Sequence, residues 1–177
     1  MNNKFVKCAK FSLSTTNLTA GSTTSIGILN AGKTNATFKN VDFISIMGRD
    51  MWNKYNEFAL VLVSINTGVN GGGFGDNTQD RILNIFISGL PFNKSTYNQT
   101  SNIRAPYALL GILPYSGAGA NIIYLPRTNL LNFKKFYSIN DINIFYQRAL
   151  QFNGTYAISN AGSTFDSMFE FEIYGIY

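Results

Sequence analysis

The side chains that most often carry enzyme chemistry are scarce in this sequence of 177 residues. It has no His and a single Cys, Cys8. A Ser-His-Asp triad, a Cys-His pair and a histidine metal site therefore cannot form within the chain, and neither can a zinc site that needs two cysteines. Only 9 residues are Asp or Glu, which leaves little material for an acid–base pair. We therefore expect no enzyme activity, no catalytic residue, no metal and no cofactor.

One stretch, residues 27–34, matches the phosphate-binding pattern Gly-x-x-x-x-Gly-Lys-Thr. That chemistry needs a buried strand before the loop and a helix after it, whose first amides point at the phosphate. Residues 21–25 before this stretch are only Gly, Ser and Thr, and those of 35–41 are poor in helix formers. The sequence therefore favours a strand, a turn and a second strand over a nucleotide site.

Three other features contain residue types that occur in catalytic or binding sites, but they lack the neighbouring groups that such a site needs. Glu170 and Glu172 are two apart on an expected strand, so they share a face at about 6–7 Å. With no third polar group beside them, they indicate a solvent-facing or partner-facing acidic edge rather than a glycosidase pair. We expect Cys8 to be a half-buried strand residue, and the glycine-rich stretch 71–76 to be a loop, where Asp76 disfavours an anion.

The net charge of +5 is unevenly placed. Residues 1–41 contain no acid and carry the whole excess, through Lys4, Lys7, Lys10, Lys33 and Lys39. Residues 1–13 are therefore a candidate basic arm, with Lys4, Lys7 and Lys10 facing an acidic neighbour or a membrane surface. The alternative is a set of ordinary solvated lysines on an N-terminal strand. Direct binding of nucleic acid is disfavoured, because these charges are sparse.

Charged residues make up 13% of the chain and aromatic residues 15%. Average soluble domains have about 25% charged residues, so this shortage favours a surface that is partly covered by other proteins. Trp52 is the only Trp. It is a candidate partner contact, because Trp is common among the residues that dominate binding energy. The alternative for Trp52 is a place in the core.

Short stretches of β-branched and aromatic residues recur along the chain, with turn residues between them. We expect strands at 5–13, 26–29, 36–38, 41–47, 58–65, 81–90, 106–113, 121–125, 133–137, 142–150 and 168–177. A helical turn is expected from Asp50, as its N-cap, with Met51, Tyr55 and Phe58 on one face. Many short strands and almost no helix indicate one all-β domain over residues 1–177.

Three segments resemble a known family. They are Asp50-Met-Trp-Asn-Lys-Tyr-Asn-Glu-Phe-Ala-Leu-Val-Leu, Asp80-Arg-Ile-Leu-Asn-Ile-Phe-Ile-Ser-Gly-Leu-Pro-Phe and Met168-Phe-Glu-Phe-Glu-Ile-Tyr-Gly-Ile-Tyr. They look like segments of the single jelly-roll penton and minor capsid proteins of large double-stranded DNA viruses of the nucleocytoplasmic type. The resemblance implies a jelly-roll β-sandwich of about eight antiparallel strands in two four-stranded sheets. It implies a structural role in an icosahedral shell and no catalytic residues.

We therefore expect a virion structural protein, penton or minor capsid component, that is assembled in the host cytoplasm. Its expected partners are other capsid proteins and itself, as a pentamer, with an internal membrane or acidic neighbour at the N-terminal arm. Two alternatives stay open: a carbohydrate-binding jelly-roll module that uses exposed Tyr and Trp, and a trimeric ligand of the tumour-necrosis-factor or C1q type. Because Lys7 and Lys10 interrupt the apolar stretch that a signal peptide needs, we do not expect secretion. We also expect no small-molecule substrate.

Overall fold

The computed structural model describes residues 4–14, 27–29, 35–70, 82–93, 108–114, 122–124, 130–148 and 164–177. These residues form ten strands and two short helices. In chain order they are β1 (Phe5–Ser14), β2 (Gly27–Leu29), β3 (Asn35–Asp42), α1 (Phe43–Met47), α2 (Arg49–Lys54), β4 (Glu57–Asn70), β5 (Ile82–Ser88), β6 (Ala108–Pro114), β7 (Ile122–Tyr124), β8 (Leu131–Lys134), β9 (Ile139–Arg148) and β10 (Thr164–Ile176). None of the helices in the described part of the chain has the length and hydropathy needed to cross a bilayer.

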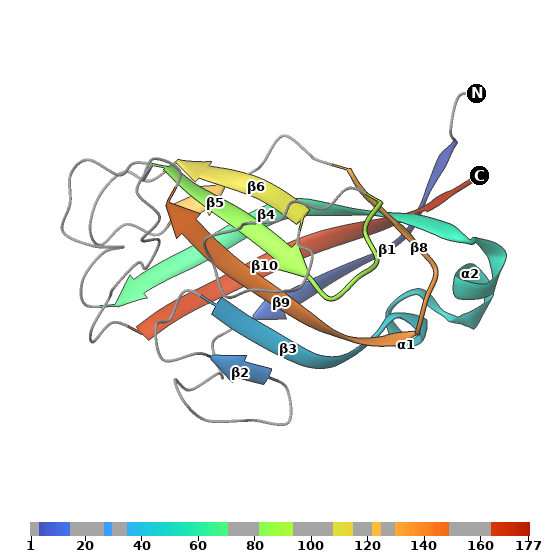
Figure 1. Cartoon of the computed structure of the whole chain (residues 1–177), viewed down its shortest axis with the longest axis horizontal. Coiled ribbons are helices and arrows are strands. Elements are labelled where there is room, and N and C mark those ends of the chain that lie inside the picture. Colours follow the sequence, from blue (N-terminus) through green and yellow to red (C-terminus); the bar gives the residue numbers. More distant parts are fainter. Residues whose placement is uncertain are drawn as a thin grey trace.

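The strands form two antiparallel sheets that face each other (Figure 1). One sheet has the order β1-β10-β4-β7, with β8 also paired to β4, and the other has the order β2-β3-β9-β5-β6. Across both sheets the pairs β1–β10, β3–β9, β4–β7/β8 and β5–β6 are nested, as in one long hairpin rolled into two layers. This is the strand order of a jelly roll.

The expected all-β jelly-roll sandwich is therefore confirmed. The described strands outnumber the eight expected for two reasons. The short β2 adds an outer strand beside β3, and β7 and β8 together take the place of one strand along β4.

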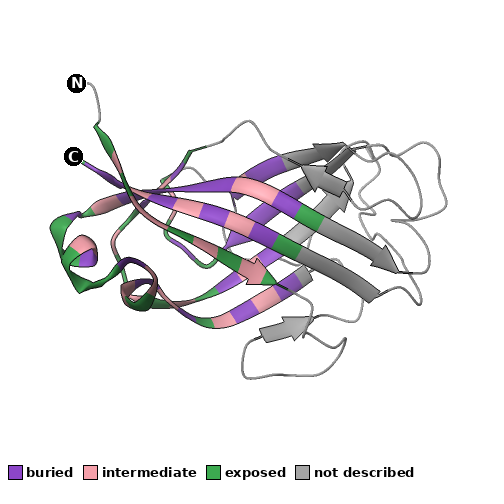
Figure 2. Ribbon diagram, turned by 180° about the vertical axis from the view of Figure 1, so that it is seen from behind, coloured by how far each residue is buried: buried purple, intermediate pink, exposed green. Residues whose placement is uncertain are grey.

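The core lies between the sheets and is filled by alternate residues of the strands. On β10, Phe169, Phe171 and Ile173 are fully buried, whereas Glu170 and Glu172 face outward. Figure 2 shows this alternation of burial along β10 and the neighbouring strands. Because successive strand residues point to opposite sides, the pattern fixes which face of β10 lies inside.

The connection between β3 and β4 differs from the prediction at 41–47, which is wrong as a strand beyond Asp42. The Asp42 carboxylate accepts hydrogen bonds from the Ile44 amide, at 3.0 Å, and from the Ser45 hydroxyl, at 2.7 Å. The bond from the Ile44 amide satisfies one of the free amides at the helix start. The chain therefore turns into α1 at Phe43.

The second helix was predicted correctly in place but not in detail. It begins at Arg49 with Gly48 as its N-cap, so Asp50 lies in the first turn and is not the cap. Its buried residue is Trp52 rather than Met51. Tyr55 ends the helix in an extended conformation, which leads directly into β4.

Both helices lie at one end of the sandwich, together with the connection between β8 and β9, the start of β1 and the end of β10 (Figure 1). We call this the helical end. Main-chain hydrogen bonds join its parts: the Lys135 amide donates to the Asn56 carbonyl and the Phe43 amide to the Ser138 carbonyl. The strand predicted at 133–137 ends at Lys134, so these bonds hold residues 135–138 as an ordered connection.

Candidate interaction surfaces

Strand β1 forms the outer strand of its sheet and is not a projecting arm. Residues from Phe5 to Ser14 pair with β10 over its length from Ile176 to Met168. The inward side chains of β1 pack on the core, and Phe11 stacks on Phe171 with ring centroids 5.2 Å apart. The expectation of a free arm is therefore wrong for residues 5–13, because their apolar face belongs to the sandwich.

Lys7 and Lys10 both point to the outer face of the sheet, although residues three apart on a regular strand would face opposite sides. The pairing register shifts between Lys7 and Ala9, so Cys8 is an extra residue in β1. Such a bulge changes which side the following residues face. It therefore brings the two lysines to the same surface.

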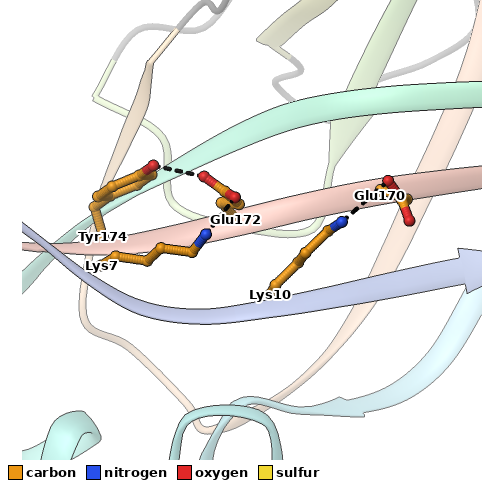
Figure 3. A network of polar contacts seen from close by, with 5 residues as sticks. All are labelled: Lys7, Lys10, Glu170, Glu172 and Tyr174. Carbon is orange, nitrogen blue, oxygen red and sulfur yellow. Dashed lines mark hydrogen bonds and ion pairs between the residues drawn. The ribbon is translucent and has the colours of Figure 1, made fainter. Parts of the chain in front are cut away.

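On that surface the two lysines meet the two glutamates of β10 (Figure 3). The Lys7 ammonium contacts the Glu172 carboxylate, and the Lys10 Nζ lies 3.3 Å from Glu170 Oε2. Two hydroxyls complete the set: Tyr174 donates to Glu172, and Ser64 of β4 donates to Glu170 at 2.6 Å. We call these six residues the sheet-face network.

The sheet-face network favours the ionised carboxylates. The Ser64 hydroxyl, and then Lys10, lower the pKa of Glu170. Lys7, and then Tyr174, lower the pKa of Glu172. In turn, the hydrogen bond to Glu172 raises the pKa of Tyr174. These groups therefore form a paired surface at neutral pH rather than an acid–base pair.

The contacts of the sheet-face network bear directly on the predicted roles of its residues. Glu170 and Glu172 do share a face, as predicted, but each carboxylate is met by a lysine of the same chain. Lys7 and Lys10 therefore already have acidic neighbours within their own sandwich. Lys4 is exposed at the helical end, where its carbonyl accepts a hydrogen bond from the Tyr177 amide.

Cys8 is half-buried on β1, as predicted. Its thiol lies 3.4 Å from the Val6 carbonyl, and burial raises its pKa. The thiolate that would be needed for nucleophilic or metal chemistry is therefore disfavoured. Within the described part of the chain, no three Cys, Asp or Glu side chains are grouped so that they could hold a metal ion.

Trp52 is a core residue with only 6% of its surface exposed. Its ring stacks between those of Phe58, at 5.4 Å, and Phe43, at 6.3 Å. The Lys135 ammonium lies 5.3 Å from the centre of the same ring. The interpretation of Trp52 as a partner contact is therefore wrong in this fold, because neighbouring side chains already cover the ring.

A second aromatic group at the helical end joins α2 to the end of β10. The Tyr55 hydroxyl donates to the Tyr177 hydroxyl at 3.2 Å, and the Lys54 ammonium lies 5.5 and 5.6 Å from the two ring centres. The lysine, and then the Tyr55 hydroxyl, lower the pKa of Tyr177. The hydrogen bond to Tyr177 raises the pKa of Tyr55. The group holds the end of β10 against α2.

The exposed apolar side chains at the helical end were not predicted as a surface. Phe136 is 61% exposed, Tyr137 67% and Ile139 53%. They lie in the connection between β8 and β9 and at the start of β9, just after Lys134 and Lys135. The sequence signal for this surface is the aromatic pair Phe136-Tyr137, which directly follows the lysine pair Lys134-Lys135. The strand β8 ends at Lys134, so the aromatic pair lies outside it.

Of the two predicted loops, the first is described only in its flanking strands and the second is not described. The stretch that matches the phosphate-binding pattern has β2 at its start and β3 directly after it, and these strands pair antiparallel, Leu29 opposite Ala36. This confirms the prediction of two strands in place of a strand and helix. Residues 30–34 between them, and the glycine-rich stretch 71–76, lie outside the described residues.

We compared the sequence with models of known protein families and with curated proteins. No model of a known protein family matches the sequence. A search of curated proteins also finds no match. The surfaces described above therefore have to be interpreted from their own chemistry.

Proposed function

We propose that this chain is a structural subunit of a virion, a penton or minor capsid component of an icosahedral shell like those of large double-stranded DNA viruses. The observation that carries the proposal is the nested order of strands, in which β1 pairs with β10 and β3 with β9. This is the strand order that the resembled family would require. The chain would act by packing against other capsid proteins and copies of itself, and would assemble in the host cytoplasm.

The placement of the three family-like segments supports this proposal. Residues 50–62 run from α2 into β4, and residues 168–177 make up the second half of β10, which pairs with β4. Residues 80–92 contain β5, in the opposite sheet. The likeness thus falls on central strands of both layers.

The chemistry of the described surface also supports a subunit that works by packing. The carboxylates of the sheet-face network are paired with lysines, and Cys8 is held as a thiol. Phe136, Tyr137 and Ile139 are each more than half exposed, and the first two rings are in contact. Exposed apolar groups of this kind are typical of surfaces that contact other proteins.

A carbohydrate-binding module has less support. Sugar rings are usually met by a flat, exposed aromatic face, but Trp52 is buried and the rings of Phe136 and Tyr137 lie at 61° to each other. A trimeric ligand of the tumour-necrosis-factor or C1q type would have the same sandwich architecture. The number of subunits in the assembled protein is therefore the observation that distinguishes it from a penton. Sedimentation of the purified chain as a trimer would favour that alternative, whereas a pentamer would favour a penton.

The test of the proposal is mass spectrometry of purified particles from the virus or infected cell that encodes the chain. We expect the chain to be among the abundant proteins of intact particles. When particles are disrupted and the capsid fraction is removed, the chain should be missing from the remaining material. An antibody against the chain should label the particle in electron micrographs. Particles that assemble and infect normally without the chain would overturn the proposal.

A further inference from the structure

Strand β1 has a strand on only one side within the residues that the structure describes, because it is the outer strand of its sheet. Its inward side chains Phe11 and Leu13 are only partly buried, whereas their partners on β10, Phe171 and Phe169, are fully buried (Figure 2). The side of β1 away from β10 is therefore accessible to solvent. Accessible backbone groups beside apolar side chains form an edge to which another strand could add.

The extra residue Cys8 interrupts this edge. Tyr174 and Ile173 follow each other on β10, but their partners Lys7 and Ala9 on β1 are separated by Cys8. A bulge of this kind breaks the even spacing of the backbone donors and acceptors that a further strand would need. A regular neighbouring strand could therefore not follow β1 along its whole length.

Strand β3 of the opposite sheet has the same feature where its outer neighbour ends. In the described residues, β2 reaches along β3 only as far as Phe38. The register shifts beyond that point, so that Lys39 and Asn40 together stand opposite Asp141 of β9. Asn40 has a φ of 55°, and its amide donates to the Asp141 carboxylate at 2.9 Å. A hydrogen bond thus holds this bulge in place.

The other two register shifts of the described strands follow the same rule. Leu110 is the extra residue of β6, which is the outer strand beside β5. Val63 is the extra residue of β4, in the stretch between the partners of β8 and those of β7. By contrast, β5, β9 and β10 each lie between two described strands and contain no extra residue. The bulges therefore fall on the stretches that have one unpaired side in the described structure.

Lysines accompany the bulges of β1 and β3. The Lys7 and Lys10 side chains flank Cys8 and are 51% and 50% exposed, although each meets a glutamate of β10. Lys39 directly precedes Asn40. Lysine on an edge strand disfavours the addition of another strand. If a sheet continued through a second copy of β1, the lysines of both copies would share one face and repel each other.

We propose that these bulges, above all the one at Cys8, keep the open edges of the sandwich from accepting another strand. The inference does not depend on the proposed virion function, because it concerns the edges of the sandwich alone. In a shell subunit, it would mean that neighbouring proteins meet this chain through side chains and not through a continuous sheet.

The test deletes Cys8 from the full chain. The register places Lys7 and Ala9 opposite consecutive residues of β10, so the deletion should leave a regular β1 with every other side chain on its present face. We expect this variant to self-associate about tenfold or more tightly than wild type in sedimentation velocity, since each cross-strand pair adds stability. Hydrogen exchange should show slower exchange, on association, of those β1 amides that do not bond to β10.

Two further variants separate the bulge from its side chain and from its position. Cys8→Ser keeps the extra residue without the thiol and should behave as wild type in both measurements. Deletion of Asn40, the extra residue of β3, should likewise promote association, with slower exchange in β3 rather than β1. Circular dichroism should show that each variant is folded.

A folded Cys8 deletion variant that associates no more than wild type would overturn the inference, and so would association that leaves the β1 amides unprotected. The wild-type chain provides a measurement that does not depend on the folding of any variant. Its β1 amides that do not bond to β10 should exchange at the same rate in dilute and in concentrated solution. Slower exchange of these amides on concentration would show that β1 does accept a strand. None of these results depends on whether the chain is found in virus particles.

Discussion

Gly175 of β10 lies directly against the ring of Tyr55, so close that a Cβ atom at Gly175 would come within 2.4 Å of the ring carbon Cδ2. This close approach places the last residues of β10 against Tyr55, the residue that ends α2. The Tyr55 hydroxyl can then reach Tyr177, and the ring packs on Phe58 of β4 with centroids 6.2 Å apart. The absence of a side chain at one position therefore allows the helical end to close on the sheet.

We expect Gly175→Ala to lower the free energy of unfolding by about 1–3 kcal/mol, because overpacking a core forces side chains or backbone to shift. Chemical denaturation of the purified chain measures this change. In a Tyr55→Leu background the same substitution should cost much less, since the ring that it meets is gone. An equal cost in both backgrounds would show that the contact with Tyr55 is not the reason for Gly175.

Substitutions at two other glycines, Gly48 and Gly89, distinguish the cost of backbone strain from the cost of steric overlap. Gly48 has φ +84° and Gly89 φ +103°, both unfavourable for other residues, but only Gly89 is crowded: a Cβ there would lie 1.9 Å from the Asp141 carbonyl oxygen. Gly48→Ala should therefore destabilise by the strain alone, about 1–3 kcal/mol, and Gly89→Ala by clearly more. Thermal unfolding followed by circular dichroism compares them, and equal losses would contradict the predicted overlap.

The fold could largely be predicted from the sequence because alternation along strands is a local signal. Phe169, Phe171 and Ile173 alternate with Glu170 and Glu172, and the same residues alternate in burial in the structure. Stretch 41–47 is one exception, besides the early end of the strand predicted at 133–137. Its β-branched and aromatic residues are typical of a strand, yet the hydrogen bonds of the Asp42 side chain start a helix there.

The surfaces were harder to predict, because they depend on features that a sequence does not display. The bulge at Cys8 brings Lys7 and Lys10 to one face and thereby opposite the two glutamates of β10. Nothing in the local sequence indicates this shift of register. The burial of Trp52 likewise depends on Phe43 of α1 and Phe58 of β4, two rings from neighbouring elements that contact it in the folded chain.

The sheet-face network should make stability depend on pH in the acid range. The pKa of Glu170 and that of Glu172 are both lower in the folded chain than in the unfolded chain, where Glu has a pKa of about 4.3. Their contribution to stability is therefore fully present above that value and is lost as pH falls through the folded pKa values. Denaturation midpoints measured from pH 7 down to pH 3 should decrease with pH.

The matched variants for this prediction are Glu170→Gln/Glu172→Gln and Lys7→Met/Lys10→Met. Both should flatten the acid limb of the stability curve, the first by removing the titrating groups and the second by removing the cations that favour their ionised form. Some slope should remain, because the Ser45 hydroxyl and the amides of Ser45 and Ile44 lower the pKa of Asp42. Curves with the wild-type slope in both variants would show that the network does not contribute. High salt should weaken the effect, since these pairs are partly exposed.

Trp52 offers the sharpest check on the packing of the helical end, because it is the only Trp and its fluorescence needs no deconvolution. With its ring between Phe43 and Phe58, emission should lie at short wavelength in the folded chain, and acrylamide should quench it poorly until the chain unfolds. Trp52→Ala should cost about 3–5 kcal/mol, the range for a large aromatic removed from a core, and Trp52→Phe clearly less. If Trp52 were instead a partner contact, the monomer would show a long-wavelength, readily quenched emission that shifts on association, and Trp52→Ala would leave the unfolding midpoint almost unchanged.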